Sequence, residues 1–172
     1  MTTDVLKIKH LSIDFHTMEG EVHAIRDVTL KLHPGEILAL VGESGSGKSV
    51  TTKAVMQLLP NNAKVVGGSV EYEGKDLLKM PEKDLQELRG NELAEIFQDP
   101  MTALDPTMRV GKQIEEVFTG HKDVSKSEIH EKALSIMKLV GISDAEKRFR
   151  QYPHELSGGM KQRIMIAMAL VS

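Results

Sequence analysis

The first forty residues show two different patterns of apolar positions. Apolar and polar residues alternate over residues 5–15 and again over residues 22–32, which predicts two strands that each bury one face. Pro34 and Gly35 then form a turn signal. From Glu36 to Val41 the chain is almost continuously apolar, a pattern typical of a strand covered on both faces. The N-terminal part of the chain is therefore expected to contain β-sheet.

The pattern changes to helical spacing after a glycine-rich stretch that ends at Gly47. That spacing continues to Pro60, where the ring and the missing N–H end a helix. Three elements are predicted between Pro60 and residue 98. They are a short strand over residues 70–73 preceded by Gly67-Gly68-Ser69, a helix from Pro81 to about Arg89 that stops at Gly90, and a core strand over residues 93–97.

Almost every residue from about Val110 to Arg150 follows the period of a helix. Two capping boxes, each a serine followed three residues later by a glutamate, predict helix starts at Ser125 and Ser143. Gly141 is expected to be the C-cap between them. Ser157 is expected to begin a last helix. The pattern as a whole predicts an α/β core into which an α-helical subdomain is inserted.

Composition narrows the classes of function. The 172 residues are 40% hydrophobic and 27% charged, as in ordinary soluble globular proteins. The formal net charge of -3, with acids and bases interleaved, argues against a nucleic-acid coat and against a polybasic membrane anchor. Cysteine is absent and the seven histidines are scattered, so neither a disulfide framework nor a metal cluster is expected. The sequence has no signal-peptide layout and no apolar run long enough to span a membrane. If the protein acts at a membrane, we therefore expect it to do so from the cytoplasmic side.

Residues 42–49, Gly-Glu-Ser-Gly-Ser-Gly-Lys-Ser, match the phosphate-loop motif GxxxxGK[ST] without a mismatch. Glycines let the backbone wrap close to phosphates with its N–H groups pointing inward, and the following helix presents its positive end to the same anion. Lys48 is expected to reach the β- and γ-phosphates of ATP, and the Ser49 hydroxyl to bind Mg²⁺. The motif predicts nucleotide binding but leaves kinase, GTPase and transporter open. The candidate nucleotide-binding residues of this loop are Gly42, Glu43, Ser44, Gly45, Ser46, Gly47, Lys48, Ser49 and Val50.

A second candidate anion site is the segment Leu156-Ser157-Gly158-Gly159-Met160. Ser157 is expected to cap a helix, and the two glycines leave the first N–H groups of that helix accessible to a phosphate. An ordinary capped helix can carry the same residues, but the phosphate loop upstream favours the anion site. The segment resembles the LSGGQ signature of the ATP-binding cassette (ABC) ATPases, with Met160 in the final position. The resemblance implies a P-loop NTPase fold of the ABC nucleotide-binding type, with an N-terminal antiparallel β part, an incomplete core sheet and an inserted helical subdomain.

The resemblance extends to two more positions. Residues 96–100 are similar to the family's Q-loop, whose glutamine meets Mg²⁺ and the attacking water, and this assigns Gln98 both a metal-binding and a catalytic role beside Lys48. The family also stacks an aromatic residue from the first strands on adenine. Phe15 is the candidate, with His23 as the runner-up and a plain core role for Phe15 left open. In the family two domains pack head to tail, and each signature closes on the ATP of the other. This implies a second ABC ATPase subunit as a partner.

Residues 98–106 and 152–160 resemble, more narrowly, the oligopeptide and dipeptide importer ATPases, in which methionine at the end of the signature is usual. This implies a peripheral ATPase subunit on the cytoplasmic side of the cell membrane. Its partners would be transmembrane permease subunits and, indirectly, an extracellular substrate-binding protein, without nucleic acid. Relatives in this group also import nickel and glutathione, so the cargo stays open. Residues 101–110 are expected to border the groove that receives the permease.

The family's Walker B strand, its catalytic glutamate and its switch histidine cannot be mapped onto this sequence. We expect an ATP-binding core over residues 1–98, a helical subdomain over residues 99–157 and a signature helix over residues 158–172. The chain is expected to be a shortened form of a longer protein, with negligible ATP hydrolysis of its own. A non-transport ABC ATPase and a small-molecule kinase are the alternatives. A non-transport ABC ATPase would need a long coiled-coil insertion or a second cassette, and the segment after Gln98 is too short for either. A small-molecule kinase would not need the second anion site that the signature provides.

Overall fold

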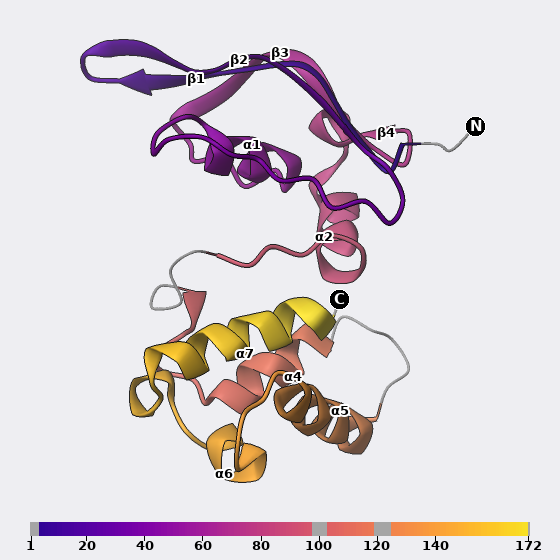
Figure 1. The fold of residues 1–172 in the computed structure, drawn as a ribbon, viewed down its shortest axis with the longest axis vertical. Coiled ribbons are helices and arrows are strands. Elements are labelled where there is room, and N and C mark those ends of the chain that lie inside the picture. The colour runs from indigo at the N-terminus through magenta and orange to yellow at the C-terminus, as the bar shows by residue number, and fades with distance from the viewer. Residues whose placement is uncertain (1–3, 98–102, 119–124, 172) are drawn as a thin grey trace. The chain divides into compact units, whose positions relative to one another are not determined.

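A computed structural model describes residues 4–97, 103–118 and 125–171. The chain divides into two compact units, residues 1–86 and residues 87–172, and helix α2 (Glu82–Asn91) spans the boundary (Figure 1). Each unit has buried apolar side chains of its own. The division into three segments expected from the sequence stays a prediction.

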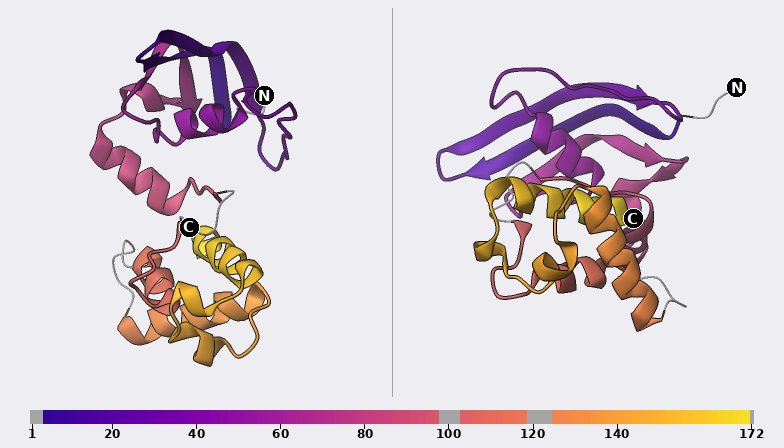
Figure 2. Two further views of the ribbon diagram at one scale, coloured as in Figure 1. Left: turned by 90° about the vertical axis from the view of Figure 1, so that its left-hand side faces the viewer. Right: turned by 60° about the horizontal axis from the view of Figure 1, so that its bottom comes forward.

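The first unit is built on a four-stranded antiparallel sheet with the strand order β2-β1-β3-β4. β1 (Leu6–Thr17) pairs with β2 (Gly20–Leu32) on one side and with β3 (Ala63–Tyr72) on the other, and β4 (Lys75–Asp76) is short. The alternation predicted for β1 is confirmed, because Leu11 and Ile13 are fully buried. Helix α1 (Lys48–Val55) lies against one face of the sheet, as Figures 1 and 2 show.

The prediction of buried core strands at residues 36–41 and 93–97 is wrong for this structure. Neither segment is a strand, and Ile37 and Val41 are 96% and 93% exposed. Ile96 and Phe97 are exposed as well. A strand covered on both faces needs hydrogen-bonded neighbours and packing layers. Among the described residues no strand of the sheet pairs with either segment, so apolar composition alone does not make them strands.

The second unit is a cluster of helices around one core. Its elements are α4 (Val110–Phe118), α5 (Lys126–Leu139), α6 (Ala145–Phe149), the 3₁₀ turn η2 (Pro153–Glu155) and α7 (Gly158–Val171). The core joins α4, α5 and α7 through side chains that include Ile114, Met137 and Ile164. Gly111 allows close packing there, since a Cβ on it would lie 2.2 Å from the ring of Phe149. None of the described helices is long and apolar enough to cross a bilayer.

The capping residues predicted from the sequence are confirmed for α5 but not for α6. At the start of α5 the Ser125 hydroxyl accepts from the N–H of Glu128 and the Glu128 carboxylate accepts from the N–H of Ser125, so this capping box is confirmed. Gly141 follows α5 with φ +79, as a C-cap glycine does. The second predicted capping box, Ser143 with Glu146, is wrong. The N-cap of α6 is Asp144, which has a left-handed φ of +52 and makes no side-chain capping hydrogen bond.

The element boundaries predicted from two groups of glycines are also wrong. Gly90 lies inside α2 and does not stop it, because exposed helices tolerate an internal glycine at a cost of about 1 kcal/mol. Gly67 and Gly68 do not precede a short strand but lie within the longer β3, where the pairing with β1 shifts register. A Cβ on Gly68 would lie 2.4 Å from the carbonyl oxygen of Lys9, so glycine is required at this close approach of two strands.

Candidate functional site

The phosphate loop is closed around the ammonium group of Lys48. Its Nζ donates to the carbonyl oxygens of Gly42 and Glu43 at 2.8 and 2.7 Å, and to the Ser46 hydroxyl at 3.2 Å. The N–H of Ser46 donates to the carbonyl of Glu43 at 3.2 Å, which makes a turn in the middle of the loop. Lys48 is the first residue of α1, so the helix start fixes where the loop lysine emerges.

Left-handed glycines bend the loop into the helix. Gly45 has φ +82 and Gly47, the N-cap of α1, has φ +90, conformations that residues with a Cβ rarely adopt. Gly47 also lies close to the sheet. A Cβ there would lie 2.5 Å from Cδ1 of Ile25 and 3.1 Å from the carbonyl oxygen of Ala24, both on β2. The sheet therefore positions the N-terminus of α1, and no side chain fits at residue 47.

These residues fit a bound phosphate. The loop places a lysine ammonium group beside the first turn of α1, where free N–H groups and the helix dipole attract an anion. Thr51 anchors that turn, since its N–H and hydroxyl both donate to the carbonyl of Gly47 at 2.9 and 3.0 Å. Ser44 and Ser49 are exposed and Val50 is half-buried, so solvent reaches the loop and the start of the helix. The arrangement can hold a polyphosphate by charge and by backbone donors.

The signature segment begins helix α7 in the second unit. The Ser157 hydroxyl accepts from the N–H of Met160 at 3.3 Å, and the Ser157 carbonyl accepts from Lys161, so the predicted cap is confirmed. Gly158 and Gly159 are exposed, and a Cβ on either would meet nothing within 4 Å. The backbone at Gly158 and Gly159 is therefore open to the surroundings, as an anion site at a helix start requires.

A closed turn leads into the signature. The N–H of Tyr152 donates to the Glu155 carboxylate at 2.7 Å, and the N–H of Glu155 donates to the carbonyl of Tyr152 at 3.0 Å. Leu156 is buried in the core of this unit. Arg109 lies over the Tyr152 ring, with its Cζ 5.9 Å from the ring centroid. These contacts fix the backbone from which Ser157 emerges.

The residues predicted for nucleotide binding are distributed over the two units. The loop residues 42–50 lie together in the first unit, and residues 157–160 lie together in the second. Phe15 is half-buried in β1, opposite Val22 and Ala63. His23 is tied by its Nδ1 to the carboxylate of Asp14 at 2.7 Å. Gln98 lies outside the described residues.

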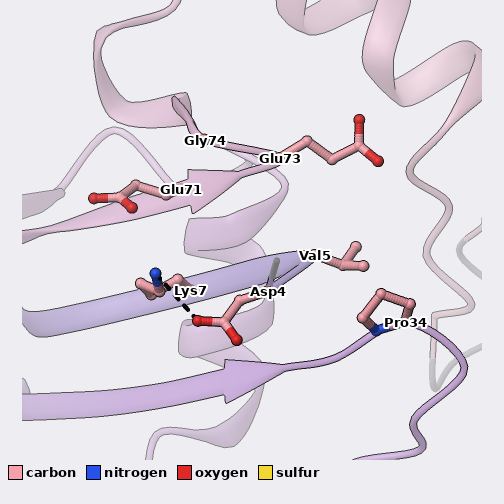
Figure 3. Close-up of a pocket in the computed structure, with 7 residues that line it drawn as sticks. All are labelled: Asp4, Val5, Lys7, Pro34, Glu71, Glu73 and Gly74. Atoms are coloured by element: carbon pink, nitrogen blue, oxygen red, sulfur yellow. Dashed lines mark ion pairs between the residues drawn. The ribbon is translucent and has the colours of Figure 1, made fainter. Parts of the chain in front are cut away.

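A separate cavity of about 410 Å³ lies at the end of the sheet and contains none of the predicted site residues. Figure 3 shows its lining, with Asp4 paired to Lys7 at 3.1 Å. The hydrogen bond from Lys7, helped by the charges of Lys31 and His33, lowers the pKa of Asp4. The acids that line this cavity also include Glu71 and Glu73, so its lining is more acidic than basic. We interpret it as the place where the start of β1 is tied to the end of β2.

Sequence reasoning did not single out Gln113 of α4. Its side chain is buried, with 5% of its surface exposed, and it makes three hydrogen bonds to the backbone of residues 105–108. The available signal was a polar residue between Val110 and Ile114, at an apolar position of the helical pattern.

Comparisons with known proteins give one family. A family described as "ABC transporter" matches residues 25–172. The chain is 53% identical over 171 residues to the oligopeptide transport ATP-binding protein OppD of Bacillus subtilis, and 52% identical over 169 residues to the dipeptide transport ATP-binding protein DppD of Lactococcus lactis subsp. cremoris. These matches cover 99% and 98% of this chain but 48% of each relative. The chain thus spans about half the length of the curated relatives it matches.

Among solved structures, the ATP-binding cassette MJ0796 has a similar fold. Its dimeric post-hydrolysis form bound to ADP and Pi matches with a TM-score of 0.86 at 25% identity, over 96% of this chain and 69% of that one. The fold expected from the sequence, a nucleotide-binding cassette with an antiparallel β part and a helical part, is confirmed by this likeness.

Proposed function

Because the chain belongs to the ABC transporter family, we propose that it is the ATP-binding part of an ATPase subunit that energises the import of peptides. The observation that carries the proposal is the phosphate loop, in which Lys48 is held between loop carbonyls at the start of α1. The similarity to oligopeptide and dipeptide transport ATP-binding proteins over nearly the whole chain supports the choice of cargo class.

In this proposal the loop holds the phosphates of ATP. Lys48 exchanges its bonds to loop carbonyls for bonds to the β- and γ-phosphates, and neutralises charge on the phosphoryl group that is transferred. Backbone N–H groups of residues 42–50 bind the remaining phosphate oxygens. Bound Mg²⁺ would supply further charge neutralisation, and the Ser49 hydroxyl and Gln98 are the residues assigned to it. Phe15 is assigned to the adenine face, because it lies on β1 and is only half-buried.

The signature is assigned to a second subunit's nucleotide. Ser157, Gly158, Gly159 and Met160 begin a helix that is capped by Ser157 and exposed at its two glycines, and this suits the terminal phosphate of an ATP held elsewhere. A head-to-tail pair of such subunits, placed against transmembrane subunits on the cytoplasmic side of the membrane, follows from this assignment. The dimeric cassette of similar fold supports it.

The test is calorimetric titration of Mg-ATP into the chain and into Lys48→Ala. We expect Lys48→Ala to abolish measurable binding, because the loop loses its only lysine while the backbone cradle stays intact. Lys53→Ala is the matched control, since it removes the same charge from the last turn of the same helix. Equal affinities for the wild-type chain and Lys48→Ala would refute the assignment of the phosphate loop.

The peptide-import part of the proposal needs a separate test. We expect the protein to co-purify from its own membranes with a transmembrane permease, and peptide uptake by the cells to fail when Lys48→Ala is introduced into the gene. Uptake that survives Lys48→Ala, with ATP binding lost in vitro, would show that the protein serves another system.

A further inference from the structure

Thr51 is a polar residue on the buried side of α1. It is only 5% exposed, and Ala54, one turn further along the same helix, is buried as well. A position of this kind is normally apolar, because a buried hydroxyl is unfavourable unless it makes a hydrogen bond. Valine has the same shape without the hydroxyl. The presence of threonine at residue 51 therefore directs attention to the bond that its hydroxyl makes.

The Thr51 hydroxyl bonds to the peptide group that joins the phosphate loop to α1. It donates to the carbonyl oxygen of Gly47 at 3.0 Å, and the N–H of Thr51 donates to the same oxygen at 2.9 Å. The carbonyl of this N-cap residue thus accepts two hydrogen bonds, whereas the helical pattern alone provides one. Both bonds come from one residue on the packed face of the helix.

The orientation of this carbonyl determines the direction of the next N–H. The peptide between Gly47 and Lys48 is trans, so the N–H of Lys48 points opposite to the Gly47 carbonyl. Because the carbonyl is directed along α1 toward Thr51, that N–H is directed out of the helix start, where it has no acceptor within the helix. A second hydrogen bond to the carbonyl also polarises the peptide group and makes its N–H a stronger donor.

Threonine often bonds back to a carbonyl of the preceding helical turn, so the bond alone does not indicate a role. Thr52 is an example of this ordinary case. Its hydroxyl donates to the carbonyl of Ser49 at 3.1 Å, but the residue is exposed, so water can replace the bond. Thr51 differs from Thr52 because it is buried and because its acceptor is the last carbonyl of the phosphate loop.

We propose that Thr51 is a positioning residue for nucleotide binding, which acts through the Gly47 carbonyl to orient and polarise the Lys48 N–H as a donor to phosphate. The inference rests on the proposed function, which supplies the phosphate. Thr51 itself touches no nucleotide in this assignment. Its hydroxyl and the phosphate lie at opposite ends of one peptide group.

The test is calorimetric titration of Mg-ATP into Thr51→Val, with Thr52→Val as the matched control. The two variants carry the same substitution at neighbouring positions of one helix, and each removes one hydroxyl that donates to a backbone carbonyl. We expect Thr51→Val to weaken Mg-ATP binding about fivefold, the change that follows from losing one hydrogen bond of average net strength. Thr52→Val should stay within about twofold of the wild type.

Two further readouts separate positioning from a general loss of structure. In proton–nitrogen correlation spectra of the nucleotide-free chain, the amide nitrogen resonance of Lys48 should move upfield in Thr51→Val, because the carbonyl of the same peptide group has lost a donor. It should keep its place in Thr52→Val. Thr51→Ser retains the hydroxyl and should restore both the resonance and the affinity. If Thr51→Val does not fold, Thr51→Ala takes its place with the same expectations.

Failure of the inference can be distinguished from failure of the proposed function. A folded wild-type chain that does not bind Mg-ATP would contradict the proposed function and, with it, the inference. Binding by the wild type that Thr51→Val retains within twofold would overturn the inference alone. So would a loss of affinity in Thr51→Val that leaves the Lys48 resonance in place or that Thr51→Ser fails to restore, since the hydroxyl would then have only a packing role.

Discussion

The contact between the phosphate loop and β2 predicts a large effect of Gly47→Ala. Two costs add at this residue. Its φ of +90 is left-handed, which costs a residue with a Cβ about 1–2 kcal/mol. The new methyl group would also lie 2.5 Å from Cδ1 of Ile25, and such overpacking costs about 1–3 kcal/mol. We therefore expect the first unit to lose about 2–5 kcal/mol of its free energy of unfolding.

Gly45→Ala is the matched control, because Gly45 lies in the same loop with φ +82 but has nothing within 4 Å of its Cβ position. It should show the conformational cost alone, about 1–2 kcal/mol. A second comparison removes the obstacle. Ile25→Val deletes Cδ1, costs about 0.5–1.5 kcal/mol by itself, and should recover part of the loss when combined with Gly47→Ala.

The assay is urea unfolding followed through the amide signals of β1 and β2, which report on the first unit alone. Calorimetry with Mg-ATP accompanies it. We expect Gly47→Ala to weaken ATP binding more than Gly45→Ala does, because Gly47 lies against β2 whereas Gly45 has nothing within 4 Å of its Cβ position. Equal destabilisation by the two substitutions, or additive effects of Gly47→Ala and Ile25→Val, would refute the role given to this contact.

Two further predictions concern the second unit. Ser157→Ala removes the hydroxyl that caps α7 and should lower the free energy of unfolding of this unit by about 0.5–2 kcal/mol, measured by urea denaturation. Burial of the Glu115 carboxyl would raise its pKa, but hydrogen bonds from Lys112 and His130 outweigh it and lower the pKa below the ordinary value of 4.5. The ionised carboxylate therefore stabilises the unit above that value and ceases to do so as the pH falls through the lowered pKa. The stability advantage of the wild type over Glu115→Gln should shrink between pH 6 and pH 3, and an advantage independent of pH would contradict this.

The features predicted correctly from the sequence are set by residues that lie close together along the chain. The turn from the glycine-rich loop into α1, the Ser157 cap and the Ser125 box depend on residues within a few positions of each other, so glycine and serine placement alone indicates them. The two long antiparallel strands were also predictable, because their side chains alternate and a short turn joins them. Family membership followed from two short motifs and their order along the chain.

What could not be predicted depends on distant partners. Gln113 was missed because its role is set by loop 104–108, whose position relative to α4 is a matter of tertiary structure. The start of α6 was misplaced by one residue, since Ser143 offers the better cap by composition but Asp144 takes the left-handed conformation. The segments 36–41 and 93–97 have the composition of buried strands, but composition does not specify which strand they pair with.

The absence of strand pairing at residues 36–41 and 93–97, among the residues that the structure describes, indicates what fixes the geometry of the phosphate loop. Val41 immediately precedes the phosphate loop and Phe97 immediately precedes Gln98, yet no strand among the described residues pairs with the segment before either of them. The loop geometry seen here thus cannot come from a strand that leads into it. The loop geometry must be fixed from its C-terminal end. There Gly47 packs against β2, and Lys48 donates hydrogen bonds to the loop carbonyls. If this is right, substitutions of the apolar residues 37–41 should leave Mg-ATP affinity nearly unchanged in this chain, whereas Gly47→Ala should not.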